Sequence, residues 1–379
     1  MLICLLIKCA KLNLIKNLNN GVSIKISALH PRYEMRKFKD LESELIPRLI
    51  ELVHYAHSKD VEITIDAEEQ DRLTLSLNII EKLALDKVIK NWTGFGIALQ
   101  AYGKRSINVI HWINKILDKR EKMHLRLVKG AYWDYEIKHA QVFGYEDYPV
   151  YSKKSLTDIS FLLCAKEILK NEKIYAKFAT HNAHTISSVH QLGQGQEYEF
   201  QRLYGMGELL YQSAEKVLNL EKKPSVYAPI GSYKDLLPYL VRRLLENGAN
   251  SSFINRLLDP ETDANWLAEN PAIRIEKEKI DIPLPKNIFT ERKNSSGFDL
   301  SENSNLENLE KSISAHKKNK INAESIYVNR DEKEKVGQKV YSIANNEEIG
   351  TAIFDDPTNV KSALENFASE KWSKYSVQE

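Results

Sequence analysis

A regular alternation of short apolar runs and longer amphipathic stretches between Val22 and Asn247 restricts this 379-residue chain to very few folds. Short runs rich in β-branched residues and bounded by turn or helix-start signals are typical of strands. The runs with this character are Val22–Ser27, Val61–Asp66, Gly94–Gln100, His124–Lys129, Ile174–Ala179, Tyr198–Leu203 and Ser225–Ile230. A parallel return needs a crossover of about a dozen residues or more, so strands separated by helices are expected to pair in parallel.

The stretches between these runs carry a helical pattern. Residues Asp40–Ser58 are the clearest case, because their apolar side chains recur with the spacing of one helix face. The residues on that face are Leu41, Leu45, Ile46, Leu49, Leu52 and Val53. The sequence therefore predicts a helix with one apolar face.

Polar residues at the ends of the apolar runs favour a barrel. In a parallel barrel of eight βα units the functional side chains gather at the C-terminal ends of the strands. Residues in such positions are Asp66, Gln100, Lys129, Thr180–Asn182 and Tyr227. An open doubly wound sheet is the alternative, but no GxGxxG sequence follows the first run. We predict an α/β fold of the (βα)8 TIM-barrel type.

The number of strands adds a further expectation. A closed barrel of this type has eight strands, whereas seven runs are visible in the sequence. Either an eighth strand is disguised, or the chain begins after the first βα unit. We favour the second interpretation and expect the barrel to lack its first strand.

Composition changes beyond Asn250. Residues 261–320 combine prolines with a run of Lys, Asn, Ser and Glu, which is typical of a linker. Structure is expected to return in residues 321–379, with strands at Ser325–Val328 and Ile349–Phe354 and a helix at Asp356–Ser369. We therefore predict an N-terminal segment (1–21), a barrel domain (22–260), this linker and a shorter α/β segment.

Charge and cysteine content exclude several classes of function. Lys and Arg total 54 against 52 for Asp and Glu, so the net charge of +2 gives no reason to expect a nucleic acid partner. The three cysteines form no CxxC pair, which argues against a disulfide framework or a zinc site and favours a reducing cytosol. No apolar run approaches the ~18 residues of a membrane span.

The segment LRLVKGAYW (Leu125–Trp133) is a candidate for phosphate binding. Arg126 and Lys129 flank the end of an apolar strand, and Lys129 could meet a phosphate. Gly130 would let a ligand approach the backbone closely. The alternative is a solvated basic strand edge.

A second candidate is FATHNAHT (Phe178–Thr185). Thr180 or Asn182 could simply cap the following helix. Alternatively, the free N–H groups of the helix start at Thr180, His181 and Asn182 could attract a phosphate. His181 and His184 have the spacing of a metal pair, but no third ligand lies nearby, so we predict no metal site.

Several charged residues suit a zwitterion such as an amino acid. Lys25 lies inside an apolar strand, where a cation is costly unless it meets an anion. Arg242 and Arg243 could clamp a carboxylate with their forked guanidinium groups, and Asp66 could meet an ammonium group. The alternatives are an edge-strand lysine that faces water and ordinary solvation of a helix. The acids that follow, Glu68, Glu69 and Asp71, suit the negative first turn of a helix.

Many segments of the chain closely resemble the bacterial proline utilisation A family. They include SIKISALHPRYE, DAEEQDRL, QAYGKRS, RLVKGAYWDYEIKHAQ, ATHNAHT, EFQRLYGMGE, YAPIGSY and LVRRLLENGAN. The resemblance extends from about Gly21 to Leu258. In this family a proline dehydrogenase is fused to an aldehyde dehydrogenase that acts on delta-1-pyrroline-5-carboxylate, and RKNSSGFDLS and IGTAIFDD resemble the linker and opening strands of that second enzyme.

The resemblance implies oxidation of L-proline by noncovalently bound FAD, with hydride transfer to flavin N5 and electrons passed to a membrane quinone. Lys25, Arg242 and Arg243 would hold the proline carboxylate, Asp66 would lie near the amine, and Tyr227 would pack on the ring. Arg126 would lie near flavin N5 and stabilise the reduced flavin. The other cofactor-binding residues would be Ala67, Gln100, Lys129, Gly130, Ala131, Trp133, Thr180, His181, Asn182 and Glu246.

The chain also departs from the family pattern. The first barrel strand, with a carboxylate that pairs with the arginine at the position of Arg242, has no counterpart, and the nucleotide-binding loop and catalytic cysteine of the aldehyde dehydrogenase are absent. We therefore expect a fragment of the fused enzyme, in the cytoplasm or peripheral at the inner membrane. Two kinds of assembly are compatible with the sequence, namely one with a complementary N-terminal or C-terminal chain and a homo-oligomer. The alternative function is that of an inactive remnant or a non-catalytic subunit.

Overall fold

The computed structural model describes residues 20–248, 268–277, 282–317, 319–324, 337–367 and 376. The chain divides into two compact units, Met1–Asn303 and Ser304–Glu379. Each unit is described by itself.

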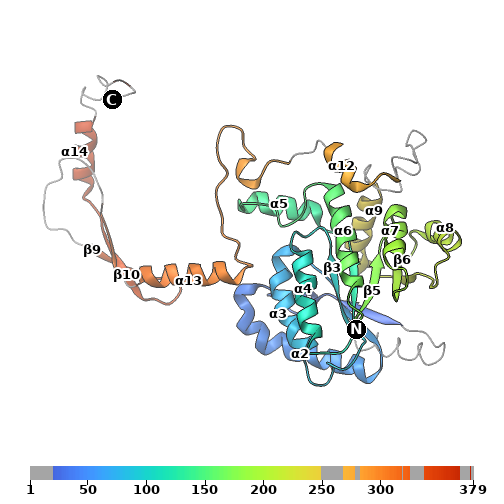
Figure 1. Cartoon of the computed structure of the whole chain (residues 1–379). Helices are drawn as coiled ribbons and strands as arrows, with labels where there is room; N and C mark the ends of the chain where they lie inside the picture. The colour runs from blue at the N-terminus through green and yellow to red at the C-terminus, as the bar shows by residue number, and fades with distance from the viewer. Residues whose placement is uncertain are drawn as a thin grey trace. The chain divides into compact units, whose positions relative to one another are not determined.

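The first unit is built around one parallel sheet in which the strands follow chain order (Figure 1). The strands are β1 (Gly21–Ile24), β2 (Glu62–Ile65), β3 (Phe95–Gln100), β4 (Met123–Val128), β5 (Ile174–Ala179), β6 (Tyr198–Leu203) and β7 (Ser225–Tyr227). All seven predicted strands are confirmed, with ends that differ by up to three residues. Among the described residues, β1 pairs with β2 alone and β7 with β6 alone. The fold is therefore a curled, barrel-type α/β sheet of seven strands, as predicted.

Helices follow the strands and cover the sheet (Figure 1). They are η1 (Ile26–Leu29), η2 (Met35–Lys37), α2 (Phe38–Ser58), η3 (Gln70–Arg72), α3 (Leu73–Ala84), α4 (Ser106–Leu117), α5 (Trp133–Phe143), α6 (Lys154–Leu169), α7 (Ala183–Leu192), α8 (Glu208–Leu218) and α9 (Tyr233–Gly248). The predicted helix Asp40–Ser58 is α2, and every residue of its predicted apolar face is buried. The helical spacing thus identified the face that packs in the core.

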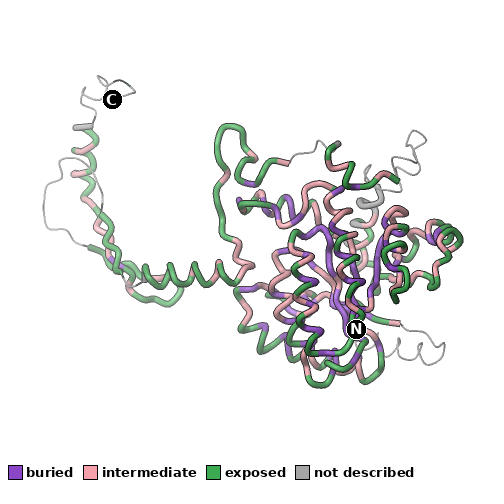
Figure 2. The backbone as a smooth tube through the Cα atoms, in the orientation of Figure 1, coloured by how far each residue is buried: buried purple, intermediate pink, exposed green. Residues whose placement is uncertain are grey.

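The two faces of the sheet differ in chemistry because side chains alternate along a strand. Buried apolar residues of one phase include Ile63, Ile65, Phe95, Leu125 and Leu127. Side chains at the alternate positions point into the concave interior, and many of them are polar. They include Thr64, Asp66, His124, Arg126, Lys177 and Gln201. The buried strands of the sheet stand out in the backbone view (Figure 2). The functional groups of the fold are therefore on its inner side.

Part of the predicted linker packs against the barrel. Helix α12 (Pro271–Lys277) contacts α6, and the turn η4 (Pro285–Asn287) contacts α5. Residues 282–302, which we call the docked segment, are held by hydrogen bonds that include Tyr148 Oη to the Pro283 carbonyl oxygen (2.7 Å) and Asn294 Nδ2 to the Gln141 carbonyl oxygen (2.7 Å). The Arg105 guanidinium also contacts a carboxylate oxygen of Glu302 at 2.6 Å.

The second unit combines α13 (Asn303–Lys317) and α14 (Pro357–Phe367) with strands β8 (Ile321–Glu324), β9 (Gly337–Tyr341) and β10 (Glu348–Ile353). Strand β10 lies between β8, to which it is parallel, and β9, to which it is antiparallel. β10 and α14 match the predicted strand and helix closely, whereas the predicted strand Ser325–Val328 lies outside the described residues. Helix α13 was not predicted, because its polar composition was interpreted as linker.

Candidate active site

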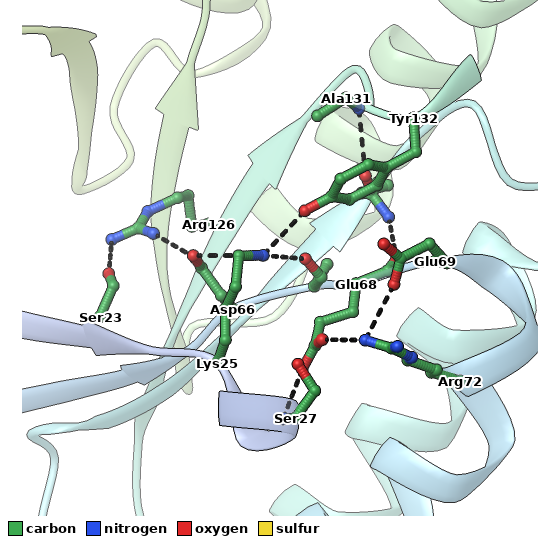
Figure 3. A network of polar contacts seen from close by, with 12 residues as sticks. Ser23, Lys25, Ser27, Asp66, Glu68, Glu69, Arg72, Arg126, Ala131 and Tyr132 are labelled. Carbon is green, nitrogen blue, oxygen red and sulfur yellow. Dashed lines mark hydrogen bonds and ion pairs between the residues drawn. The ribbon is translucent and has the colours of Figure 1, made fainter. Parts of the chain in front are cut away.

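Charged side chains from three strand ends meet on the inner side of the sheet. Lys25 follows β1, Asp66 follows β2, and Arg126 lies on β4. Asp66 Oδ1 is 3.0 Å from Arg126 Nη1, and Asp66 Oδ2 is 4.0 Å from Lys25 Nζ. Figure 3 shows the Asp66 carboxylate between the two cations. Of the sequence-predicted residues, these three are brought together in one cluster.

Arg126 is held in a fixed orientation by its hydrogen bonds. Its side chain is 9% exposed. Nε donates to Gln201 Oε1 at 2.8 Å, and Nη2 donates to Ser23 Oγ at 2.7 Å. The guanidinium carbon also lies 5.3 Å from the centre of the Tyr227 ring, within the range of a cation–π contact. A buried cation with this many partners has little freedom to turn.

Lys25 keeps its charge although it is partly buried. Its Nζ donates to Tyr132 Oη at 2.8 Å and to the Ala67 carbonyl oxygen at 3.4 Å. Burial by itself lowers the pKa of Lys25, but the negative charge of Asp66 and the contact with Tyr132 outweigh it, so the pKa is raised. The side chain is 37% exposed, so the ammonium group is accessible to a small anion.

Of the acids after Asp66, Asp71 lies in the first turn of a helix, as predicted, because η3 runs directly into α3. Glu69 is at the N-cap position of η3, and Glu68 precedes it. Glu68 instead accepts from the Ser27 N–H at 3.0 Å and from Arg72 Nη1 at 2.7 Å. This buried carboxylate ties the segment after β1 to the segment after β2 (Figure 3). The tertiary contact with Ser27 was not visible in the sequence.

Gln100 and Gly130 hold the ends of β3 and β4 together. Gln100 is 4% exposed, and its amide donates to the Glu68 carbonyl oxygen (2.7 Å) and accepts from the Ala131 N–H (3.2 Å). Gly130 has a φ of +143°, and a Cβ there would lie 2.4 Å from the Tyr102 ring. The close approach predicted at Gly130 is therefore made by an aromatic side chain of the protein itself.

Lys129 is ion-paired rather than solvated at a strand edge. Its ammonium group contacts Asp158, which is also 3.5 Å from Lys154 Nζ. Burial lowers the pKa of Lys129 despite this partner, while the two lysines outweigh burial and lower the pKa of Asp158. Nearby, Trp133 begins α5 and donates from Nε1 to the Tyr151 carbonyl oxygen at 2.9 Å.

The start of α7 confirms the capping interpretation of Asn182. Asn182 Oδ1 accepts from the Thr185 N–H at 2.9 Å. Thr180 Oγ1 accepts from the Asn182 N–H at 3.2 Å. His181 Nε2 accepts from the Leu203 N–H at 3.1 Å, and burial, together with the charges of Arg243 and Arg202, lowers the pKa of His181 to about 4. His181 is therefore neutral near pH 7.

The last strand and α9 bring further predicted residues to the same region. Burial raises the pKa of Tyr227 to about 12, although the charges of Arg126 and Arg243 oppose this effect. The Arg243 guanidinium lies 5.3 Å from the centre of the Tyr239 ring. The side chains of Arg242 and Glu246 lie outside the described part of the structure. Within the described residues, no group of three or more potential metal ligands is present.

A family model described as "Proline dehydrogenase" matches residues 7–256. The chain belongs to the proline dehydrogenase family. It is 45% identical over 313 residues to the bifunctional protein PutA of Escherichia coli K12, covering 77% of this chain and 24% of that protein. A crystal structure of bifunctional proline utilization A matches with 43% identity and a TM-score of 0.74, over 78% of this chain and 31% of that one.

A further structure, PutA of Bdellovibrio bacteriovorus inactivated by N-propargylglycine, has a TM-score of 0.84 over 99% of this chain and 41% of that chain. Because its identity is 24%, it shows the fold alone. The chain spans about a quarter of the length of the PutA proteins it matches. Within the described residues, none of the helices is both apolar enough and long enough to span a bilayer.

Sequence reasoning missed three residues of this candidate site. Ser23 and Gln201 bind the Arg126 guanidinium, and Tyr132 binds Lys25. Ser23 and Gln201 lie within predicted strands, in the same phase as residues that point inward. Strand ends alone do not indicate either residue, whereas the period of two along each strand indicates both.

Proposed function

We propose that this chain is built to oxidise L-proline to delta-1-pyrroline-5-carboxylate with FAD, the first step of proline breakdown to glutamate. The observation that carries the proposal is the cluster of Lys25, Asp66 and the buried Arg126 on the inner side of the sheet, in a chain of the proline dehydrogenase family. It combines one accessible cation, one carboxylate and one immobile cation. These are the groups that a zwitterionic substrate and a redox cofactor would require.

The donor set fits a flavin dinucleotide. Lys129 and the N-terminal turn of α7 after Thr180–Asn182 are suited to phosphate oxygens, because both present positive charge or N–H groups. We propose that Ala67, Gln100, Gly130, Ala131, Trp133 and Glu246 complete the cofactor site together with His181. FAD, when bound, supplies the hydride acceptor, and the protein supplies orientation and electrostatics.

Arg126 would provide the fixed positive charge beside the reacting centre. Its three hydrogen-bonded neighbours, Ser23, Asp66 and Gln201, hold the guanidinium before any ligand arrives. A preorganised charge stabilises developing negative charge without the cost of reorganisation. This is why we assign it a catalytic role with Asp66.

The substrate would be held by its two charges. Lys25, with Arg242 and Arg243, would bind the proline carboxylate, and Asp66 would attract the amine. Tyr227 would pack on the ring. Release of a hydride from the ring carbon next to nitrogen requires a neutral amine, so the ammonium proton must leave first. Loss of the hydride from the neutral amine leaves a protonated imine, which can release its N–H proton to water, and the imine then hydrolyses.

The partners of the reaction belong to the same proposal. Electrons would pass to a membrane quinone, which would place the chain in the cytoplasm and, during turnover, at the inner membrane surface. The outer edges of β1 and β7 have no strand neighbour among the described residues. These edges favour a complementary chain that adds a strand to the sheet. The same edges support the second candidate function, a non-catalytic subunit or remnant.

The visible absorption spectrum of the purified chain, recorded before and after anaerobic addition of L-proline, tests the proposal. A flavin spectrum that bleaches with proline is the expected result. Arg126→Met should slow the bleaching by about 10²- to 10³-fold, the usual effect of removing one preorganised donor. Arg32→Met, which removes a 55% exposed cation, is the matched control and should have no effect. A wild-type chain that stays colourless with added FAD would favour the non-catalytic subunit.

A further inference from the structure

Lys177 is a buried cation that the proposed reaction does not use. It lies on β5, and its side chain is 7% exposed. Its Nζ is 2.6 Å from Glu62 Oε2 on β2 and 3.7 Å from Glu199 Oε1 on β6. Since β3 and β4 separate β2 from β5 in the sheet, the first ion pair spans the concave interior. We call Lys177, Glu62 and Glu199 the interior triad.

The triad is connected to Arg126 by one side-chain amide. Gln201 Nε2 donates to Glu199 Oε1 at 2.8 Å, and Gln201 Oε1 accepts from Arg126 Nε at 2.8 Å. The reverse orientation of this amide would direct its oxygen at a carboxylate and its NH2 group at a guanidinium. The charges on either side therefore determine which way Gln201 points.

The register of the sheet places the charged residues of β4, β5 and β6 directly beside one another. Arg126 is the direct cross-strand partner of Lys177, and Lys177 is the direct partner of Glu199. Like charges directly opposite each other destabilise a sheet, and buried charges are tolerated only when they are paired. Each cation accordingly has its own carboxylates, Asp66 for Arg126 and the two triad glutamates for Lys177.

We propose that Lys177 is a positioning residue for Arg126. By pairing with Glu199, Lys177 keeps the Glu199 carboxylate away from the Arg126 guanidinium. The Glu199 carboxylate then accepts from Gln201 Nε2 and orients the Gln201 amide. Gln201 in turn holds Arg126 Nε, so that the other guanidinium nitrogens face Asp66 and Ser23. Without Lys177, Glu199 would keep its link to Arg126 through Gln201 but lose its own cation, and the guanidinium would turn toward it. The consequence for the reaction rests on the proposed function, whereas the orientation of Arg126 does not.

The test compares Lys177→Met with Lys177→Arg, which keeps the charge, and with Lys82→Met. Lys82 is the matched control, because it also pairs with a glutamate, Glu42, but is 44% exposed. A second variant, Lys177→Met with Glu62→Gln, removes one charge of each sign and keeps the interior balanced. The double variant replaces Lys177→Met in the test if Lys177→Met alone fails to fold.

The first readout needs no cofactor. Nitrogen-15 NMR of arginine-labelled protein follows exchange of the Arg126 Nε hydrogen with solvent, with the signal assigned by its loss in Arg126→Lys. Exchange should be roughly two- to tenfold faster in Lys177→Met and in the double variant, the factor that corresponds to losing one buried hydrogen bond. It should be unchanged in Lys82→Met and restored in Lys177→Arg.

The second readout is proline oxidation with FAD bound. Misplacement of Arg126 should lower kcat by roughly 10- to 100-fold and change KM little. A wild-type chain that binds no flavin contradicts the proposed function but leaves the exchange result standing. Equal exchange in all folded variants overturns the positioning role, and so does unfolding of both Lys177 variants, which would make the triad purely structural.

Discussion

Glu136 shows at the scale of one residue how burial sets the protonation of a carboxyl group. It is 3% exposed. Its Oε1 accepts from the Gln70 N–H at 2.8 Å and from Tyr102 Oη at 3.2 Å. Burial raises the pKa of Glu136 to about 7, and the charges of Asp71 and Glu69 add to the rise, while the two hydrogen bonds oppose it. The folded chain therefore binds a proton here that the unfolded chain has released.

Glu136 should make the stability of the fold depend on pH. Because its pKa is raised on folding, its contribution is fully present below about pH 4.5 and is lost as the pH rises through about 7. Glu136→Gln keeps an acceptor oxygen and removes the ionisation. We expect urea unfolding at pH 8 to show a gain of up to roughly 3 kcal/mol in the free energy of unfolding, and little change at pH 4.

Glu42→Gln is the control for this prediction, because Glu42 pairs with Lys82 at the surface and is 50% exposed. It should shift stability by less than about 1 kcal/mol at either pH. An equal effect of Glu136→Gln at pH 4 and pH 8 would contradict the assigned ionisation.

At the scale of the element, the docked segment is an extension of the barrel unit. Helix α5 ends at Phe143 and is capped by Gly144, whose φ of +63° suits a glycine at a helix C-terminus. A Cβ at Gly144 would lie 1.7 Å from the Ser295 carbonyl oxygen. The absence of a side chain at Gly144 therefore allows residues 282–302 to pack against this end of α5.

Gly144→Ala should release the docked segment. Gly195→Ala is the matched control, because Gly195 also has a positive φ (+78°) but a Cβ there would meet no atom within 4 Å. The left-handed backbone alone should cost each variant about 1 to 2 kcal/mol, and the clash should cost Gly144→Ala about 1 to 3 kcal/mol more. Urea unfolding measures the difference, and trypsin should cleave at Arg292 faster in Gly144→Ala alone. Equal stability and equal cleavage would show that the segment is not held at Gly144.

At the scale of the whole molecule, the described residues of the barrel unit form a sheet with a protected centre and two edge strands. Strands β3, β4 and β5 each have two strand neighbours, whereas β1 and β7 each have one among the described residues. An edge strand presents unpaired N–H and C=O groups that can recruit another strand. The sheet should therefore be least stable where β1 and β7 lie.

Hydrogen exchange followed by mass spectrometry checks this expectation. Amides of β4 and β5 should be the most protected and should open only with global unfolding, while those of β1 and β7 should exchange by local opening. Addition of a chain that supplies a neighbouring strand should slow exchange at β1 and β7 and leave β4 unchanged. Protection of β7 equal to that of β4 in the isolated chain would mean that another strand already covers this edge.

The sequence by itself determined the element order and the barrel-type class. Strand periodicity, the apolar face of α2 and polar residues after strand ends are local signals, and each depends on residues close together in the chain. They located all seven strands and assigned Lys25 and Asp66 to a zwitterion site, whereas Arg126 was assigned to a phosphate site and was placed near the substrate only by the family resemblance. Helix α13 could have been predicted in the same way, because Leu306, Leu309 and Ile313 recur with helical spacing.

Only the tertiary structure decided what those residues contact. Gly130 packs on Tyr102, Glu68 binds the Ser27 N–H, and Gln201 links Arg126 to Glu199. Apart from the contact between Gln201 and Glu199, these join residues between 28 and 75 positions apart. They depend on the register and curl of the sheet, because register sets which inward-facing side chains are opposite each other. No local pattern carries that information, and so the partners of each charge could not be predicted from the sequence.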